Sequence, residues 1–242
     1  MKVLALLLAA VVFLPAPGSA QASFETSVAG AGILPIGGFA DHVRTGCPGI
    51  VLGAGLRPGS GRVSVGAELG FFIYGHDRRR DPLTASQPDL EVPRTVWNTI
   101  MAAHLTARLA LGSGSVMPYL EALAGFSSLR TDSNVERAAL AEGYPGIRSI
   151  LQTDSAVSGG LGVGVTLLLR AARAAEPDRR TGEPGGERRR LLCDFGLRLI
   201  GGGRADYLTE ESIREENEET VCDLIRSPTT RLTFLLRLRW VL

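Results

Sequence analysis

The sequence predicts an all-β protein, an eight-stranded antiparallel up-and-down transmembrane β-barrel. Three observations lead to this fold class. The chain begins with a leader for export, eight segments alternate apolar with small or polar residues, and the connections between them alternate between long and short. The composition agrees, because 45% hydrophobic residues are too many for a disordered chain and three cysteines are too few for a disulfide-built scaffold. A formal net charge of +1 also argues against a nucleic-acid partner.

The leader occupies residues 1–22. Met1 and Lys2 give a positive start, Val3 to Leu14 is an apolar run, and small residues follow, with cleavage expected after Ala20 or Ala22. No later stretch reaches the roughly 18 uninterrupted apolar residues of a membrane helix. The mature chain is therefore expected to be one exported domain, residues 23–242, either soluble or a barrel in the bacterial outer membrane.

Eight segments read as strands because their side chains alternate with a period of two. In Arg62 to Tyr74, for example, one face is continuously apolar and the other is small or polar. The first two segments are glycine-rich and the last is the most regular. The eight segments are Phe24–Leu34, Gly49–Arg57, Arg62–Tyr74, Thr95–Leu111, Tyr119–Ser127, Val157–Leu169, Leu191–Leu199 and Arg231–Leu242.

The two faces differ in a way that suits a membrane barrel. The polar face is mostly Gly, Ser and Ala with single charges, as the tight interior of an eight-stranded barrel requires. The apolar face carries no charge within the strand cores, where a lipid-facing Arg or Lys would cost roughly 2–4 kcal/mol. We therefore expect the apolar face to meet lipid and the polar face to fill the lumen.

The connections alternate between long loops and short turns, as in such barrels, with tight turns at 58–61 and 112–115. Long loops are predicted at about 35–47, 76–94, 130–153 and 204–228, the last containing a short helix from Thr209 to Thr220. The segment at about 171–190 departs from this alternation. It should be a short periplasmic turn, yet it is long and rich in Arg, Gly and Pro, a composition typical of disorder.

The inward positions carry charges whose mutual pairing would plug the lumen. A buried charge needs a partner, and eight strands leave no aqueous channel, so the plug is favoured over a charged pore or a catalytic cluster. With Leu111 placed opposite Val116, Glu121 lies opposite Thr106 and diagonal to His104 and Arg108. The predicted lumen charge network is Glu68, His104, Arg108, Glu121, Asp194, Arg198, Arg231, Arg237 and Arg239, with Glu25 near the last two.

The cysteines and the acidic segment give no metal signature, and we expect no metal and no cofactor. Cys47 and Cys222 both fall near the predicted outer rim, where a disulfide and two thiols remain equally open interpretations, while Cys193 faces lipid. The acidic stretch from Glu210 to Asp223 lacks the spacing of a calcium loop and is interpreted as solvated.

Two stretches carry a resemblance to a known family. The segment from Val28 to Asp41, which reads VAGAGILPIGGFAD, resembles the first hairpin of small outer-membrane-protein β-barrels, and the last strand through Trp240 resembles their terminal strand. The broader likeness is to the OmpA-type transmembrane barrel. It implies that barrel-assembly machinery reads Trp240 and Leu242 as an assembly signal, and that outer-membrane lipids and lipopolysaccharide surround the barrel. The chain departs from the family by ending in Leu242 instead of an aromatic residue.

The sequence thus predicts a structural or surface-interaction role with no catalysis and an extracellular partner that it does not identify. The alternative is an exported lipocalin-like carrier of a small apolar ligand, which would bury its apolar face inside. A narrow porin is third and a lipid A-modifying enzyme fourth. A hydrolase needs a Ser–His pair, yet His42 and His76 lie at strand or loop ends and His104 faces the lumen.

Overall fold

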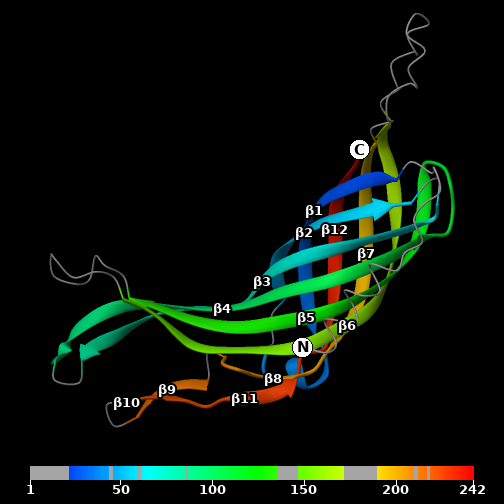
Figure 1. Cartoon of the computed structure of the whole chain (residues 1–242). Helices are drawn as coiled ribbons and strands as arrows, with labels where there is room; N and C mark the ends of the chain where they lie inside the picture. The colour runs from blue at the N-terminus through cyan, green and yellow to red at the C-terminus, as the bar shows by residue number, and fades with distance from the viewer. Residues whose placement is uncertain are drawn as a thin grey trace, which may run out of the picture.

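The chain folds into a closed antiparallel barrel of eight strands (Figure 1). This computed structural model describes residues 22–43, 46–58, 61–84, 87–135, 147–171, 190–209, 212–216 and 219–242. The barrel strands are β1 (Ser23–Pro35), β2 (Cys47–Arg57), β3 (Val63–Thr84), β4 (Gln87–Ala110), β5 (Val116–Val135), β6 (Ile147–Ala171), β7 (Arg190–Gly202) and β12 (Arg231–Val241). The predicted all-β, eight-stranded antiparallel barrel is confirmed.

The barrel closes between its first and last strands. β1 pairs with β12 from Glu25 opposite Val241 to Pro35 opposite Arg231, so no barrel strand is left with an open edge along this seam. One end of the barrel, here called the turn end, holds the two chain-reversing turns after Arg57 and after Ala110. The other end, here called the loop end, holds the 3-10 turn η1 (Gly37–Phe39) and the longer connections.

Four neighbouring strands run far past the loop end. β3, β4, β5 and β6 have 20 to 25 residues each, against 11 to 13 in the other four, and together they project to the left in Figure 1. We call this projecting sheet the extension. The predicted loop at 76–94 is therefore wrong, because β3 and β4 stay paired as far as Thr84 opposite Gln87. The predicted loop at 130–153 is likewise largely strand, paired as far as Val135 opposite Ile147.

The connection between β7 and β12 contains four short strands. β8 (Arg204–Tyr207) pairs with β11 (Ile225–Pro228), and β9 (Ile213–Glu216) pairs with β10 (Glu219–Cys222). The helix predicted from Thr209 to Thr220 is wrong. Asp154 on β6 accepts a hydrogen bond from the Asp206 backbone N–H at 2.8 Å, which holds this connection as strand against the extension.

The turn between β4 and β5 is wider than predicted, which changes the register. The Leu111 N–H donates to the Pro118 carbonyl at 2.8 Å, and Arg108 lies directly opposite Glu121. The predicted pairing of Glu121 with Thr106 is wrong by two residues. A shift of two keeps every side chain on its predicted face, whereas a shift of one would have reversed them all.

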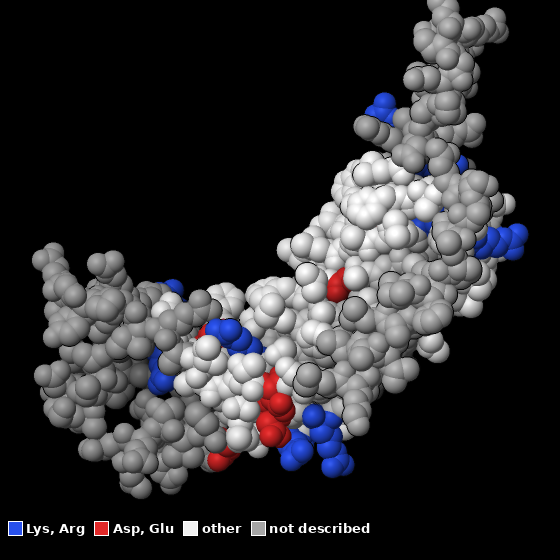
Figure 2. Space-filling view, viewed as in Figure 1, with Lys and Arg blue, Asp and Glu red and all other residues white. Residues whose placement is uncertain are grey.

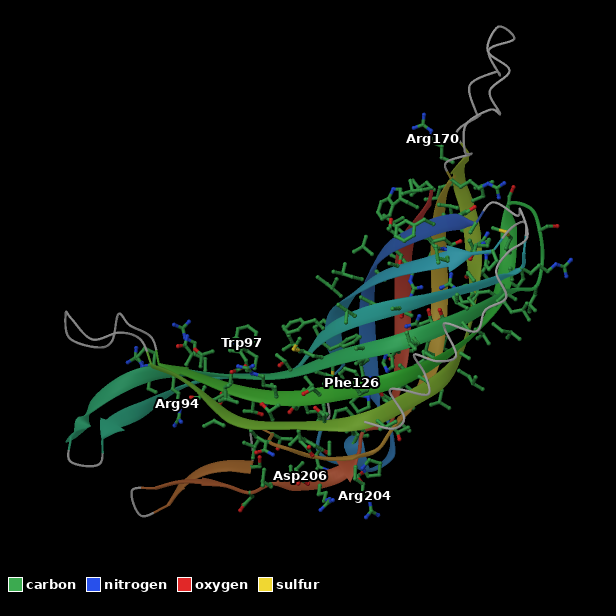
Figure 3. The ribbon with its side chains drawn as sticks, in the orientation of Figure 1. Arg94, Trp97, Phe126, Arg170, Arg204 and Asp206 are labelled. Atoms are coloured by element: carbon green, nitrogen blue, oxygen red, sulfur yellow. The ribbon has the colours of Figure 1, made fainter. Side chains whose placement is uncertain are left out.

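The outside of the barrel is apolar. The exposed large hydrophobic residues include Leu69 at 65%, Leu161 at 70% and Val157 at 72%, and similar residues occur on every barrel strand. In the face seen in Figure 2, the described part of the barrel wall is mostly white, and most charged side chains lie toward its ends and on the extension. Figure 3 shows this division, with Phe126 on the wall, Arg170 near the turn end and Arg94 on the extension.

Three predictions fall wholly or largely outside the described residues. The cleaved leader at 1–22 and the segment at about 171–190 are two of them, and the Cys222 side chain is the third. Among the described residues, no helix has the length and hydrophobicity to cross a bilayer.

Candidate functional site: the barrel lumen

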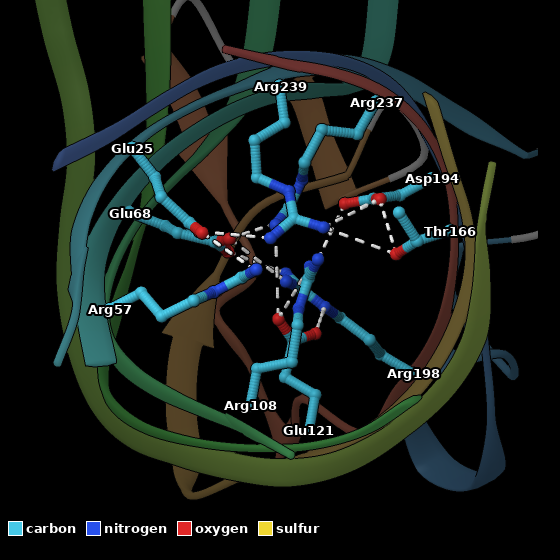
Figure 4. Close-up of polar contacts among 10 residues, drawn as sticks. All are labelled: Glu25, Arg57, Glu68, Arg108, Glu121, Thr166, Asp194, Arg198, Arg237 and Arg239. Atoms are coloured by element: carbon cyan, nitrogen blue, oxygen red, sulfur yellow. Dashed lines mark hydrogen bonds and ion pairs between the residues drawn. The ribbon is translucent and has the colours of Figure 1, made fainter. Parts of the chain in front are cut away.

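Nine charged side chains and one threonine converge in the half of the lumen nearest the turn end (Figure 4). Each of the eight barrel strands contributes at least one of them, because the period of two turns these positions inward. We call this group the lumen ion cluster. Its members are Glu25, Arg57, Glu68, Arg108, Glu121, Thr166, Asp194, Arg198, Arg237 and Arg239.

Arg198 on β7 lies at the centre of one half of the cluster. Its Nη1 and Nη2 donate to the two Glu68 carboxylate oxygens at 2.7 and 3.0 Å, and its Nε donates to Glu121 at 2.7 Å. Arg237 on β12 adds a second cation beside the same carboxylates, with Nη2 at 2.5 Å from Glu68. This fork geometry suits the planar guanidinium and explains why arginine occupies these positions.

Asp194 on β7 lies at the centre of the other half of the lumen ion cluster. It lies 2.6 Å from Arg108 and 3.1 Å from Arg239, and it accepts a hydrogen bond from the Thr166 hydroxyl at 2.7 Å. Arg239 also reaches Glu25 at 2.9 Å.

Two further pairs complete the cluster. Arg108 links the two halves through Glu121 at 3.2 Å, and Arg57 at the turn-end rim pairs with Glu25 at 2.7 Å. Except for Arg57, all of these charged side chains are buried, so each depends on its partners to offset the cost of leaving water.

Tyr119 on β5 packs the wall beside the cluster. The Arg108 guanidinium lies 4.1 Å from the centre of its ring, a cation–π contact. The ring lies over Gly164 and Gly196, where an added Cβ would come within 2.5 and 2.6 Å of its hydroxyl oxygen. Glycine is required at both positions because the tyrosine occupies the space that a side chain would fill.

A second polar layer lies closer to the loop end. His104 Nε2 contacts the Ser158 hydroxyl at 2.8 Å, and Ser158 contacts Ser127 at 3.0 Å. Arg231 donates from Nη2 to Ser127 at 2.7 Å. A Ser–His pair therefore does exist, formed between β4 and β6 over Gly125 of the intervening strand β5. Ser158 is 2% exposed, so the arrangement gives a hydrolytic substrate no access to this serine.

An apolar layer lies in the lumen at the loop end. Phe39 of η1 lies against the rings of Tyr74 and Tyr207, with centroids 6.2 and 5.4 Å away. Tyr74 donates to the Leu208 carbonyl at 3.1 Å, and Tyr207 shares a hydrogen bond with Ser227 at 2.8 Å. Burial raises the pKa of Tyr207, so its hydroxyl stays protonated. The connection that carries β8 and β11 therefore contributes to this apolar layer.

Little empty volume remains inside. A cavity of about 40 Å³ touches the ion cluster, and one of about 10 Å³ lies beside the second polar layer. The first has room for a few water molecules and the second for about one. No group of three or more His, Cys, Asp or Glu that could hold a metal ion occurs in the described part of the chain.

The remaining predicted site residues lie away from the cluster. Cys47 begins β2 and is buried beside the apolar layer, and the choice between a disulfide with Cys222 and two thiols stays open. Cys193 faces outward by register but is largely covered by its neighbours. Trp240 and Leu242 lie at the turn end and are 40% and 41% exposed. Their role as an assembly signal also stays a prediction.

Sequence reasoning missed several residues that complete the lumen. Arg57 is the last residue of its predicted segment, where alternation gives little guidance. Ser127, Ser158 and Thr166 alternate in phase with the inward positions, but a hydroxyl gives no signal until its partner in the lumen is known. Tyr119 was missed for the same reason.

The fold and its interior define a class, a closed barrel with an apolar exterior and a lumen filled by ion pairs. No family model and no curated protein matches the chain. Among solved structures, the chain is similar to Neisserial surface protein A (NspA), with a TM-score of 0.40 and 13% identity over 91% of this chain and 96% of that one. It is also similar to Ail, the attachment invasion locus protein of Yersinia pestis, solved with the heparin analogue sucrose octasulfate. That TM-score is 0.36, with 9% identity over 91% of this chain and 97% of that one.

Proposed function

We propose that the chain is an outer-membrane β-barrel protein, exported with a cleaved leader, whose lumen is plugged by paired charges. Its role is structural or surface interaction through the parts that project from the membrane. One observation carries this proposal. Large apolar side chains cover the outside of the barrel while its buried charges lie inside, the reverse of a water-soluble protein.

The height of the apolar surface supports the membrane placement. On β4 the exposed apolar residues run from Leu109 to Trp97, which is about 40 Å of strand at roughly 3.3 Å per residue. A strand tilt of about 45° reduces this to about 28 Å, close to the roughly 25–30 Å of apolar band in an outer-membrane barrel. β4 continues for another ten residues to Gln87, about 33 Å of strand, so at the same tilt the extension projects about 23 Å beyond the bilayer.

The contents of the lumen argue against the alternatives. A lipocalin-like carrier needs an apolar cavity, whereas this lumen holds ion pairs and cavities of about 40 and 10 Å³. A porin needs a continuous aqueous path, which the ion cluster and the apolar layer both interrupt. A lipid A-modifying enzyme needs its catalytic serine and histidine at the lipid surface, whereas Ser158 and His104 are buried inside.

The extension is the surface we propose for interaction. Its outer strand β3 carries Arg78, Arg79 and Arg80 in succession, and charges on an edge strand discourage pairing with other sheets. Outer-membrane lipids and lipopolysaccharide would surround the barrel below it, and barrel-assembly machinery would insert the chain. The extracellular partner stays unassigned.

Membrane fractionation followed by gel electrophoresis tests the proposal. We expect the protein in the outer-membrane fraction, with a compact band in cold detergent that shifts on boiling. A soluble periplasmic protein without such a shift would overturn the membrane placement. Planar-bilayer recordings test the plug separately, since reproducible open channels from purified protein would contradict it. Altered acylation of lipid A on expression would restore the enzyme hypothesis.

A further inference from the structure

Arg231 is the exception among the arginines of the lumen. It begins β12 with its side chain turned inward, is 1% exposed, and is the largest fully buried side chain in the described chain. Its Nη2 donates to the Ser127 hydroxyl at 2.7 Å. Its Nε and Nη1 are buried and have no hydrogen-bond partner. A buried guanidinium with two unused donors is costly unless something absent from the protein chain satisfies it.

The charges inside the barrel do not balance. Within the described residues of the lumen, five arginines are buried, namely Arg108, Arg198, Arg231, Arg237 and Arg239, against four carboxylates, Glu25, Glu68, Glu121 and Asp194. The other four arginines each form ion pairs with those carboxylates. Arg231 forms none with the described carboxylates. Arg57, the sixth arginine of the lumen, lies at the rim and is 20% exposed, so water screens its charge. The buried side chains are therefore left with one positive charge, located at Arg231.

The surroundings of Arg231 offer hydrogen-bond donors and no spare anion. The cavity of about 10 Å³ is lined by Arg231, Arg198, Thr233, His104 and Glu68 together with apolar side chains. The Thr233 hydroxyl is also buried without a partner. The Glu68 carboxylate is already shared by Arg198 and Arg237. Cys47 lies close enough to Arg231 for an electrostatic interaction, but as a neutral thiol it does not offset the charge.

We propose that the lumen binds one small monovalent inorganic anion of the halide class, held by the Nε and Nη1 of Arg231 and by the Thr233 hydroxyl. The single surplus buried charge sets the valence, and the cavity has room for about one monatomic ion. Water alone would satisfy the donors but would leave the charge uncompensated. The anion is taken up as the barrel closes, because β12 completes the wall around it.

Refolding in matched salts tests the site. The purified chain is refolded into detergent micelles in sodium chloride or in sodium gluconate, whose anion is too large for the cavity, at equal ionic strength. The midpoint of thermal unfolding should rise with chloride in a saturable way and show no such rise with gluconate. The Arg231→Met variant should lose the chloride-specific rise. The exposed control Arg226→Met, 72% exposed, should keep it.

Failure of the anion site can be distinguished from failure of the proposed membrane placement. Equal stabilisation by both salts in the wild-type chain, or a chloride effect that persists in Arg231→Met, would overturn the anion site while leaving the barrel intact. Where Arg231→Met fails to fold, Thr233→Val serves in its place and should weaken the chloride response. Crystals grown in bromide give a direct readout. An anomalous peak within hydrogen-bond distance of the Arg231 guanidinium supports the site, and its absence overturns it.

Discussion

The Glu121→Gln substitution tests whether the lumen ion cluster stabilises the barrel as a buried network. The Glu121 carboxylate is 4% exposed and lies 2.7 Å from Arg198, 3.2 Å from Arg108 and 3.9 Å from Arg237. The amide keeps the shape and volume of the side chain but removes its charge. The three arginines then share less counter-charge in a site that is buried except for a cavity with room for a few water molecules.

We expect this substitution to lower the free energy of unfolding by about 3–5 kcal/mol, as removal of one partner from a buried ion pair does. The matched control is Arg226→Gln, which breaks the exposed pair with Asp206 at 3.6 Å and should cost about 0–1 kcal/mol. Both are measured by urea unfolding of the barrel in lipid vesicles, followed by tryptophan fluorescence. A loss for Glu121→Gln no larger than that of the control would refute the reasoning, since it would mean that the cluster is hydrated.

Three further predictions address the wall, the lipid face and the extension. Gly164→Ala should destabilise the barrel by about 1–3 kcal/mol, since the added Cβ would meet the Tyr119 ring. Gly30→Ala should not, because a Cβ at that position has no atom within 4 Å. Urea unfolding compares the two variants. Leu199→Arg should cost roughly 2–4 kcal/mol in the same assay, while Leu224→Arg, equally exposed but outside the barrel strands, should be near neutral. Replacing residues 78–95 by an Asn-Gly turn should leave the heat-shifted gel band intact, because the strand pairs that close the barrel lie outside this part of the β3–β4 hairpin. Loss of the band would show that the extension is needed for folding.

The facing of the strands could be predicted from sequence, but their register could not. A period of two fixes which side chains point inward, and this placed Glu68, Asp194 and Arg198 in the lumen. The pairing of Glu121 with Arg108 depends on how many residues the turn after Ala110 contains, which the Gly-Ser-Gly-Ser stretch does not specify. Contacts across the barrel, such as that of Arg198 on β7 with Glu68 on β3, depend on closure and are invisible to local patterns.

The length of the extension could not be predicted for a different reason. A strand alternates in sequence only where its two faces meet different surroundings, as in the barrel wall, which is apolar outside and polar inside. In the extension this difference is lost, so Arg78, Arg79 and Arg80 suggest a loop although they are paired with β4. The acidic segment near Glu215 favours a helix locally, but the connection that carries it is held against the extension by Asp154.

The most direct test of the central claim places a single tryptophan at Leu161, in the middle of the apolar face, in a chain whose Trp97 and Trp240 are phenylalanine. The protein is reconstituted in vesicles of lipids brominated at shallow or deep positions of the acyl chain. We predict strong quenching of the tryptophan fluorescence, greatest with the deep bromines, and no quenching by aqueous iodide. Quenching by iodide together with indifference to brominated lipid would contradict the account, because the apolar face would then lie in water.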